Sequence, residues 1–161
     1  MDEAILLIAA YAEEDRRFME LVDAFPVSAR DHRGSEDRLS LKQTLGHIAF
    51  WDDYATRFYD TRCHHGAPEA LTPEQFEERN QQVLELVCSN PYEDVLQTYR
   101  EATRMIAVFL REHWLDLDET SRENFKIPLK HRRHHRRRLQ EVLEELGPDT
   151  QSGDALAERA S

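Results

Sequence analysis

Apolar side chains recur every three or four residues through most of this 161-residue chain, and this spacing leaves few folds open to it. It matches the 3.6-residue turn of an α-helix and not the alternation of a half-buried strand. The first such segment spans residues 2–24. Its core-facing side chains are expected to be Ile5, Ile8, Ala12, Met19 and Val22, with the stripe widened by Leu6, Tyr11, Phe18 and Leu21. The valine and isoleucine content is too low for a large sheet, so the sequence predicts an all-α fold.

Start signals mark two further helices. Ser40 and Gln43 have capping-box spacing, which satisfies two backbone donors and predicts a helix over residues 40–63. Thr72-Pro73-Glu74-Gln75 combines an N-cap, a proline at the first helical position and a capping-box glutamine. This second pattern predicts a shorter helix over residues 72–87.

Two long helices are expected in the second half of the chain. Asn90-Pro91 repeats the cap-then-proline pattern and predicts a helix over residues 90–113, with Asn90 as its cap. Residues 114–126 are polar and acidic with no sustained period, which is typical of a link. The final helix is expected over residues 128–146, ending at Gly147.

The length of the chain fits one domain with a sizeable core. We expect residues 1–147 to form a single four-helix bundle, with the 72–87 helix as an additional shorter element between the second and third core helices. Residues 148–161 are polar and poor in apolar side chains, so a disordered tail is predicted there.

Charge and composition narrow the classes of partner. With 21 basic and 32 acidic side chains, the net charge of −11 disfavours binding to nucleic acid or to anionic membranes. The beginning of the chain lacks a basic leader region, and no stretch approaches the roughly 18 apolar residues of a membrane span. Two cysteines, Cys63 and Cys88, give no disulfide framework. A cytoplasmic protein is expected.

The final helix carries the chemistry that stands out. His131 and His135 are four residues apart, so both imidazoles lie on one helical face. Counting back from Leu139 by fours reaches both, which places histidines where the apolar pattern expects leucines. Burial of an imidazole without a partner costs about 1–3 kcal/mol. A metal ion that neutral imidazoles bind, zinc or nickel, would compensate this cost.

His47 is the expected third ligand. It lies beside the apolar stripe of the 40–63 helix, one turn from Trp51, at the edge of the core. Three histidines with one open coordination position describe a catalytic metal site rather than a closed structural one. The competing interpretation is that His131 and His135 are core histidines bonded to a carboxylate, or part of a solvated basic face.

Other residues are expected near this site. Trp51 and Arg136 are expected around the pocket, and His134 points about 100° away from His135, at the rim. His113 faces the core side of its helix and is a candidate extra ligand or outer-shell group. Adjacent side chains in Cys63-His64-His65 diverge at a helix end, which favours a surface cluster over a second metal site.

One metal touches all three histidines most easily if the 40–63 and 128–146 helices run parallel. His47 lies two turns into its helix, and His131 and His135 occupy the first two turns of theirs. On this expectation the 90–113 helix runs the opposite way, and the 72–87 helix crosses an end or flank without adding a full reversal.

These residues also carry a family resemblance. Gly46-His47-Ile48-Ala49-Phe50-Trp51-Asp52, followed by His131-x-x-x-His135-Arg136 and a leucine-rich turn ending at Gly147, resembles the DinB/YfiT-like superfamily. The resemblance implies a helical bundle that binds a divalent metal through His47, His131 and His135. Several branches are transferases or isomerases that use mycothiol, bacillithiol or glutathione.

The resemblance implies chemistry but not a branch. A divalent metal, zinc or nickel, would lower the pKa of a thiol or a water and so supply an anionic nucleophile near neutral pH. The expected activity is that of a transferase or hydrolase acting on a small-molecule substrate, with a low-molecular-weight thiol as a candidate cofactor.

Two other hypotheses about the function remain open. A non-catalytic regulatory bundle could use the basic last helix to bind an acidic partner or RNA. A degenerate member of the family would keep the bundle without turnover. Homodimerisation through an exposed helix face is also open.

Overall fold

The computed structural model describes residues 2–34 and 38–147, and these residues form helices and short connections without a strand, which confirms the all-α prediction. The tail predicted at 148–161 lies outside the described residues. Within them, no helix is long and apolar enough to cross a membrane. The elements are α1 (Asp2–Ala24), a 3-10 turn η1 (Val27–Ala29), α2 (Leu41–His65), α3 (Pro73–Ser89), α4 (Tyr92–His113), α5 (Glu119–Asn124) and α6 (Lys126–Leu146).

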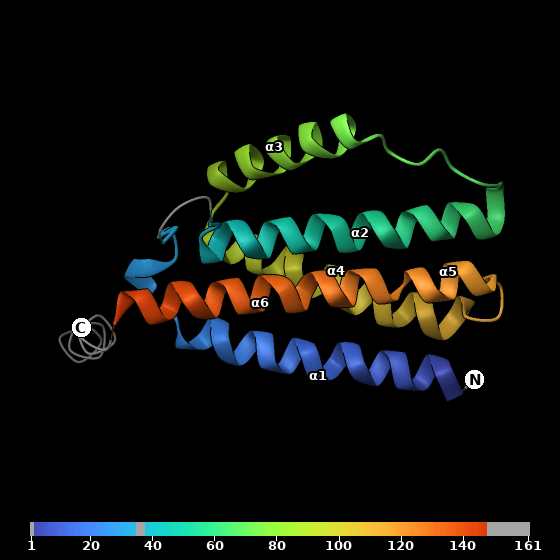
Figure 1. Ribbon diagram of the computed structural model, residues 1–161, viewed down its shortest axis with the longest axis horizontal. Coiled ribbons are helices and arrows are strands. Elements are labelled where there is room, and N and C mark those ends of the chain that lie inside the picture. The colour runs from blue at the N-terminus through green and yellow to red at the C-terminus, as the bar shows by residue number, and fades with distance from the viewer. Residues whose placement is uncertain (1, 35–37, 148–161) are drawn as a thin grey trace.

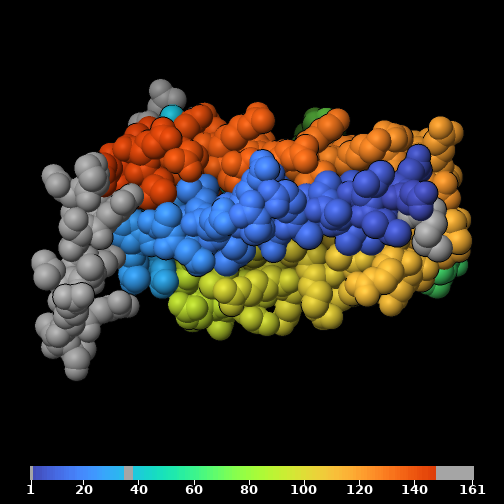
Figure 2. All heavy atoms as spheres, turned by 90° about the horizontal axis from the view of Figure 1, so that it is seen from below, coloured from blue at the N-terminus to red at the C-terminus, as the bar shows by residue number. Residues whose placement is uncertain are grey.

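Four long helices lie alongside one another, and α3 flanks α2 (Figure 1). Helix α2 contacts α4 and α6, and α1 contacts the same two helices from the other side. Figure 2 shows α1 lying along the molecule between α6 and α4. The helices thus enclose a core that runs the length of the molecule.

The predicted starts of α2 and α3 are confirmed. The Ser40 hydroxyl accepts from the Gln43 amide at 3.1 Å, and the Gln43 side chain accepts from the Ser40 amide at 3.1 Å. Thr72 and Gln75 form the same reciprocal pair, at 3.3 and 2.8 Å. Both helices therefore begin where local hydrogen bonding satisfies their first amides.

Two local predictions are wrong. Asn90 does not cap α4; it ends α3, where its side-chain amide donates to the Leu86 carbonyl at 2.7 Å. The expected link at 114–126 contains α5, whose start is capped by Asp118 accepting from the Ser121 amide at 2.7 Å. Six residues are too few to show a helical period, so only the cap could have revealed this helix.

The buried face of α1 agrees with the expected one in part. Tyr11, Phe18, Leu21 and Val22 are buried as expected, but Ile5 and Leu6 are 59% and 70% exposed, and Ala4 and Leu7 are buried instead. Glu14 is also buried on this face, where it binds Arg136 of α6. A count of apolar residues could not include Glu14, because its burial depends on a partner in another helix.

The predicted parallel orientation of α2 and α6 is wrong. The Tyr59 ring, near the end of α2, lies 4.6 Å from the Phe125 ring at the start of α6. Arg38, just before α2, pairs with Glu141 near the end of α6 at 3.2 Å. The two helices therefore run antiparallel, as Figure 1 also shows.

The cause is α3. It reverses the direction of the chain between α2 and α4, whereas the prediction placed it across an end or flank without a reversal. Helix α3 runs back along α2: the Trp51 indole binds Asn80 at 2.9 Å, and Lys42 reaches the carbonyl of Cys88 at 3.3 Å. The chain thus returns to the start of α2, and α4 runs parallel to α2 (Figure 1). The short connection through α5 then turns α6 against both.

Candidate metal centre

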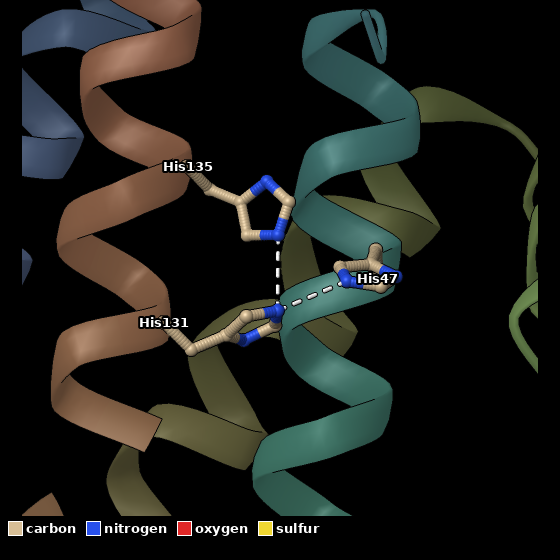
Figure 3. A group of neighbouring side chains, drawn as sticks. All are labelled: His47, His131 and His135. Carbon is tan, nitrogen blue, oxygen red and sulfur yellow. Dashed lines mark hydrogen bonds between the residues drawn. The ribbon is translucent and has the colours of Figure 1, made fainter. Parts of the chain in front are cut away.

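The three histidines predicted as ligands meet between α2 and α6. Nε2 of His131 lies 3.0 Å from Nε2 of His47 and 3.0 Å from Nε2 of His135 (Figure 3). The antiparallel orientation permits this because α6 begins opposite Tyr59 instead of at the end of α2. Its second and third turns therefore pass His47.

The spacing fits a shared metal ion. Ligand nitrogens at about 2.0–2.1 Å from a tetrahedral zinc lie about 3.3 Å apart. The observed 3.0 Å separations are within a few tenths of an ångström of that value, and the three ligand atoms all lie within 4.8 Å of one another. Small rotations of the rings would admit an ion.

Burial keeps these imidazoles neutral. Desolvation lowers the pKa of His47 to about 4. Desolvation first, and neighbouring histidines second, lower the pKa of His131 to about 4 and that of His135 to about 2. All three are therefore uncharged at neutral pH, the form that binds a metal.

Neutral rings cannot fully satisfy one another here. Nε2 of His131 has either one proton or one lone pair, so it makes one well-aligned hydrogen bond with its two neighbours, not two. Nδ1 of His47 is buried and has no hydrogen-bond partner among the described residues. Protein contacts alone leave polar ring atoms unpaired, and a cation between the Nε2 atoms would use their lone pairs.

A buried ion pair lies next to the histidines. Arg132 is fully buried, and its Nη2 donates to the equally buried Asp52 and, at 3.1 Å, to Thr103 Oγ1. Its Nη1 lies 3.5 Å from Asp15, which also accepts a hydrogen bond from the Tyr99 hydroxyl at 2.7 Å. This network joins Arg132 of α6 to side chains from the three other long helices, α1, α2 and α4.

The network divides the core into two apolar clusters. One contains Leu45, Leu139 and Val142, and the other contains Ile106, Phe125 and Leu129. A buried charge pair tolerates little displacement because each partner left alone is uncompensated. We infer that Arg132 and Asp52 fix the rotation and register of α6 against α2, and so fix the imidazoles.

Sequence reasoning missed Arg132 and Asp52. Arg132 stands within the basic run of the last helix, residues 130–138. It nevertheless lies seven residues before Leu139, two helical turns away on the same face. Asp52 likewise follows Leu45 and Ile48 on the buried face of α2. Paired charges at apolar positions on two helices were the available signal.

A cavity of about 430 Å³ opens beside His47 and His131. Trp51 forms part of its wall; its indole stacks near Phe76 at 4.9 Å and donates to Asn80. Among the described side chains that line the cavity there is no Asp, Glu, Lys or Arg. The remaining lining residues are Tyr54, Ala55, Phe58, Tyr59, Ala70, Leu71, Asn124, Ile127 and Pro128.

The other predicted neighbours lie in different places. His134 is exposed, with its ring 5.4 Å from that of His135, at the rim as expected. Arg136 does not line the cavity: its Nε binds the buried Glu14 at 2.5 Å. His113 is not near the three histidines but lies against His64, with ring centroids 5.1 Å apart.

Comparison with known proteins adds no relative to this picture. No protein-family model, curated protein or solved structure matches the chain.

Proposed function

We propose that this protein is a divalent-metal-dependent enzyme of the DinB/YfiT-like superfamily. In this assignment α1, α2, α4 and α6 are the four-helix bundle, and α3 is the additional helix between the second and third core helices. Support comes from the order of the His47 and His131-x-x-x-His135 motifs and from the packing of the long helices.

The observation that carries the proposal is the convergence of three neutral imidazoles at the edge of a cavity. Their Nε2 atoms meet at 3.0 Å contacts, and both His47 and His131 line the cavity. An ion held there has three protein ligands and one side facing the cavity. That coordination is the pattern of a catalytic centre with an open position.

The cavity wall indicates the substrate class. Its rings and aliphatic side chains favour an apolar group, and it offers tyrosine hydroxyls and the amides of Asn80 and Asn124 as uncharged polar contacts. The described lining residues include no arginine that could bind a carboxylate of a substrate. We propose a largely apolar, uncharged electrophile as substrate.

The chain's own residues would bind and orient this substrate. Trp51, held by Asn80 and packed on Phe76, provides a rigid apolar surface within contact distance of the His47 ring, 6.5 Å between centroids. A substrate bound against this apolar wall would displace water from the reacting side. A bound divalent ion would supply Lewis acidity, lowering the pKa of a thiol or water. The wall offers no carboxylate as an alternative base.

The regulatory alternative receives less support. Three arginines of the basic last helix form ion pairs within the protein: Arg132 pairs with Asp52, and both Arg133 and Arg136 contact Glu14. The charge left for an acidic partner is correspondingly reduced.

Metal content of the purified chain tests the site. We expect about one tightly held divalent ion at the three histidines of wild type, and its loss in His47→Ala, whose side chain comes from a different helix than the other two ligands. His134→Ala is the matched control, since it removes an exposed imidazole next to His135 and should leave that ion bound. Equal metal content in all three proteins would contradict the site.

Turnover is tested separately. Metal-loaded wild type should consume an apolar electrophile in the presence of a low-molecular-weight thiol or water, and His131→Ala should not. A protein that holds the ion but turns over none of a panel of thiols and electrophiles would be a binding bundle and not an enzyme.

A further inference from the structure

A second histidine cluster lies at the ends of α2 and α4. Asp60 and His64 are one turn apart on α2, and His113 is the last residue of α4. One ligand atom from each lies within 4.8 Å of the other two. Nε2 of His64 is 3.5 Å from an oxygen of Asp60, and the rings of His64 and His113 lie edge to face at 5.1 Å.

The His113 ring is oriented by two neighbours. Its Nδ1 lies 3.2 Å from a carboxylate oxygen of Asp116, and its face packs beside Phe109 at 5.0 Å. The Asp116 contact uses Nδ1, so Nε2 is the nitrogen left for a ligand. A carboxylate that receives one ring N–H while the other nitrogen binds metal is the usual arrangement around metal-bound histidines.

We propose that Asp60, His64 and His113 form a second divalent-cation site of the zinc class, with Asp116 as a positioning residue. Two imidazoles and one carboxylate are a ligand set that zinc accepts, with water completing the coordination. The site is separate from the first: thirteen residues of α2, about 20 Å at 1.5 Å per residue, separate Asp60 from His47.

The tertiary structure creates this set. Along the sequence His64 appears beside Cys63 and His65, whose side chains diverge from it. The parallel direction of α2 and α4 brings their C-terminal ends together and supplies His113 from a distant segment. Desolvation first, and Asp60, Asp116 and Asp118 second, raise the pKa of the neighbouring Cys63, opposed by Arg62, which pairs with Asp118 at 2.9 Å.

Binding there would tie the ends of α2 and α4 just before each enters a loop. A ligand that binds the folded chain and not the unfolded one stabilises it by mass action. The inference does not rest on the proposed enzyme function, because none of its residues belongs to the three-histidine cluster or lines the cavity beside it.

The experiment is a titration of metal-free full-length protein with Zn²⁺ alone, against a competing chromophoric chelator. In a His131→Ala background, which disables the first cluster, we expect one Zn²⁺ equivalent per chain. His113→Ala or His64→Ala added to that background should abolish it. His65→Ala is the matched control, because it removes an exposed imidazole adjacent to His64 and should leave the equivalent intact.

A graded variant tests the positioning role. Asp116→Asn keeps the side-chain shape, removes the carboxylate charge, and should weaken this Zn²⁺ equivalent roughly 10- to 100-fold. If His131→Ala folds poorly, the wild-type background serves, where stoichiometry should fall by one on His64→Ala and Zn²⁺ should raise Tm less than in wild type.

Two outcomes would overturn the inference. One is a His131→Ala protein, folded by circular dichroism, that takes up no Zn²⁺. The other is an equivalent that survives both His64→Ala and His113→Ala. Failure of the first cluster to bind metal would appear instead as wild type losing no equivalent on His47→Ala, so the two failures are distinguishable.

Discussion

The two histidine clusters share helix α2 but differ in what surrounds them. The first cluster, His47, His131 and His135, lies between α2 and α6. Its side chains are half buried, beside an apolar cavity and a buried ion pair. Asp60, His64 and His113 lie at a helix end, where Asp60 and His113 are half buried, His64 is exposed, and carboxylates replace the apolar wall.

The two clusters differ in what holds their candidate ligand side chains in position when no ion is bound. At the three-histidine cluster, Arg132 and Asp52 hold two helices in register, so the imidazoles converge on a rigid scaffold. At the helix ends, geometry rests on one carboxylate contact to His113 and on the last turns of two helices. A reactive centre needs the first kind of support, whereas a stabilising cation needs only the second.

The largest expected effect comes from breaking the scaffold under the first cluster. Asp52→Ala removes the fully buried carboxylate that pairs with Arg132, leaving only Thr103 and the more distant Asp15, and should destabilise the protein by about 3–5 kcal/mol. Chemical denaturation measures this. Asp53→Ala is the control: its ion pair with Arg57 is largely exposed, and its loss should cost less than about 1 kcal/mol. Similar losses for both would mean that the buried pair does not hold the helices.

Gly46→Ala should have the next largest effect, because it disturbs the packing of α3 beside His47. A methyl group at Gly46 would lie 2.1 Å from Cγ2 of Val87. We expect a loss of about 1–3 kcal/mol, despite the better helix propensity of alanine. Adding Val87→Ala should recover part of it in a double-mutant cycle. Independent, additive losses would contradict the contact as the cause.

His135→Leu should separate stability from function at the first cluster. A leucine continues the apolar line of Leu139 and removes a poorly satisfied buried imidazole, so metal-free protein should gain about 1 kcal/mol. Metal binding there should be lost. His64→Leu, at the exposed cluster, should change metal-free stability by less than about 0.5 kcal/mol. A destabilised His135→Leu would show that the imidazole is well satisfied without an ion.

The smallest expected effect is a difference between wild type and His135→Leu in how the free energy of unfolding depends on pH. Burial lowers the pKa of His135 to about 2, below the ordinary value of about 6.5 that applies when the chain unfolds. Between these values the unfolded state binds a proton that the folded state does not, so stability falls as pH falls. From about pH 7.5 to about pH 5.5, metal-free wild type should lose about 1 kcal/mol relative to His135→Leu. Parallel pH profiles would contradict the shift.

Local chemistry made much of the fold readable from the sequence. The capping pairs Ser40–Gln43 and Thr72–Gln75 fixed where α2 and α3 begin, because those hydrogen bonds form within four residues. The short α5 and the role of Asn90 were misjudged, since a cap residue alone does not say which helix it serves. Glu14 was not expected on the buried face of α1, because its partner Arg136 lies on α6.

The sequence by itself determined the four long helices and α3, and named His47, His131 and His135, because helical phase and residue type are local properties. Only the tertiary structure decided that α2 and α6 run antiparallel, that Arg132 is buried against Asp52, and that His113 lies beside His64. The physical reason is that direction and register depend on how α3 and the buried charges pack, and these contacts join residues far apart in the chain.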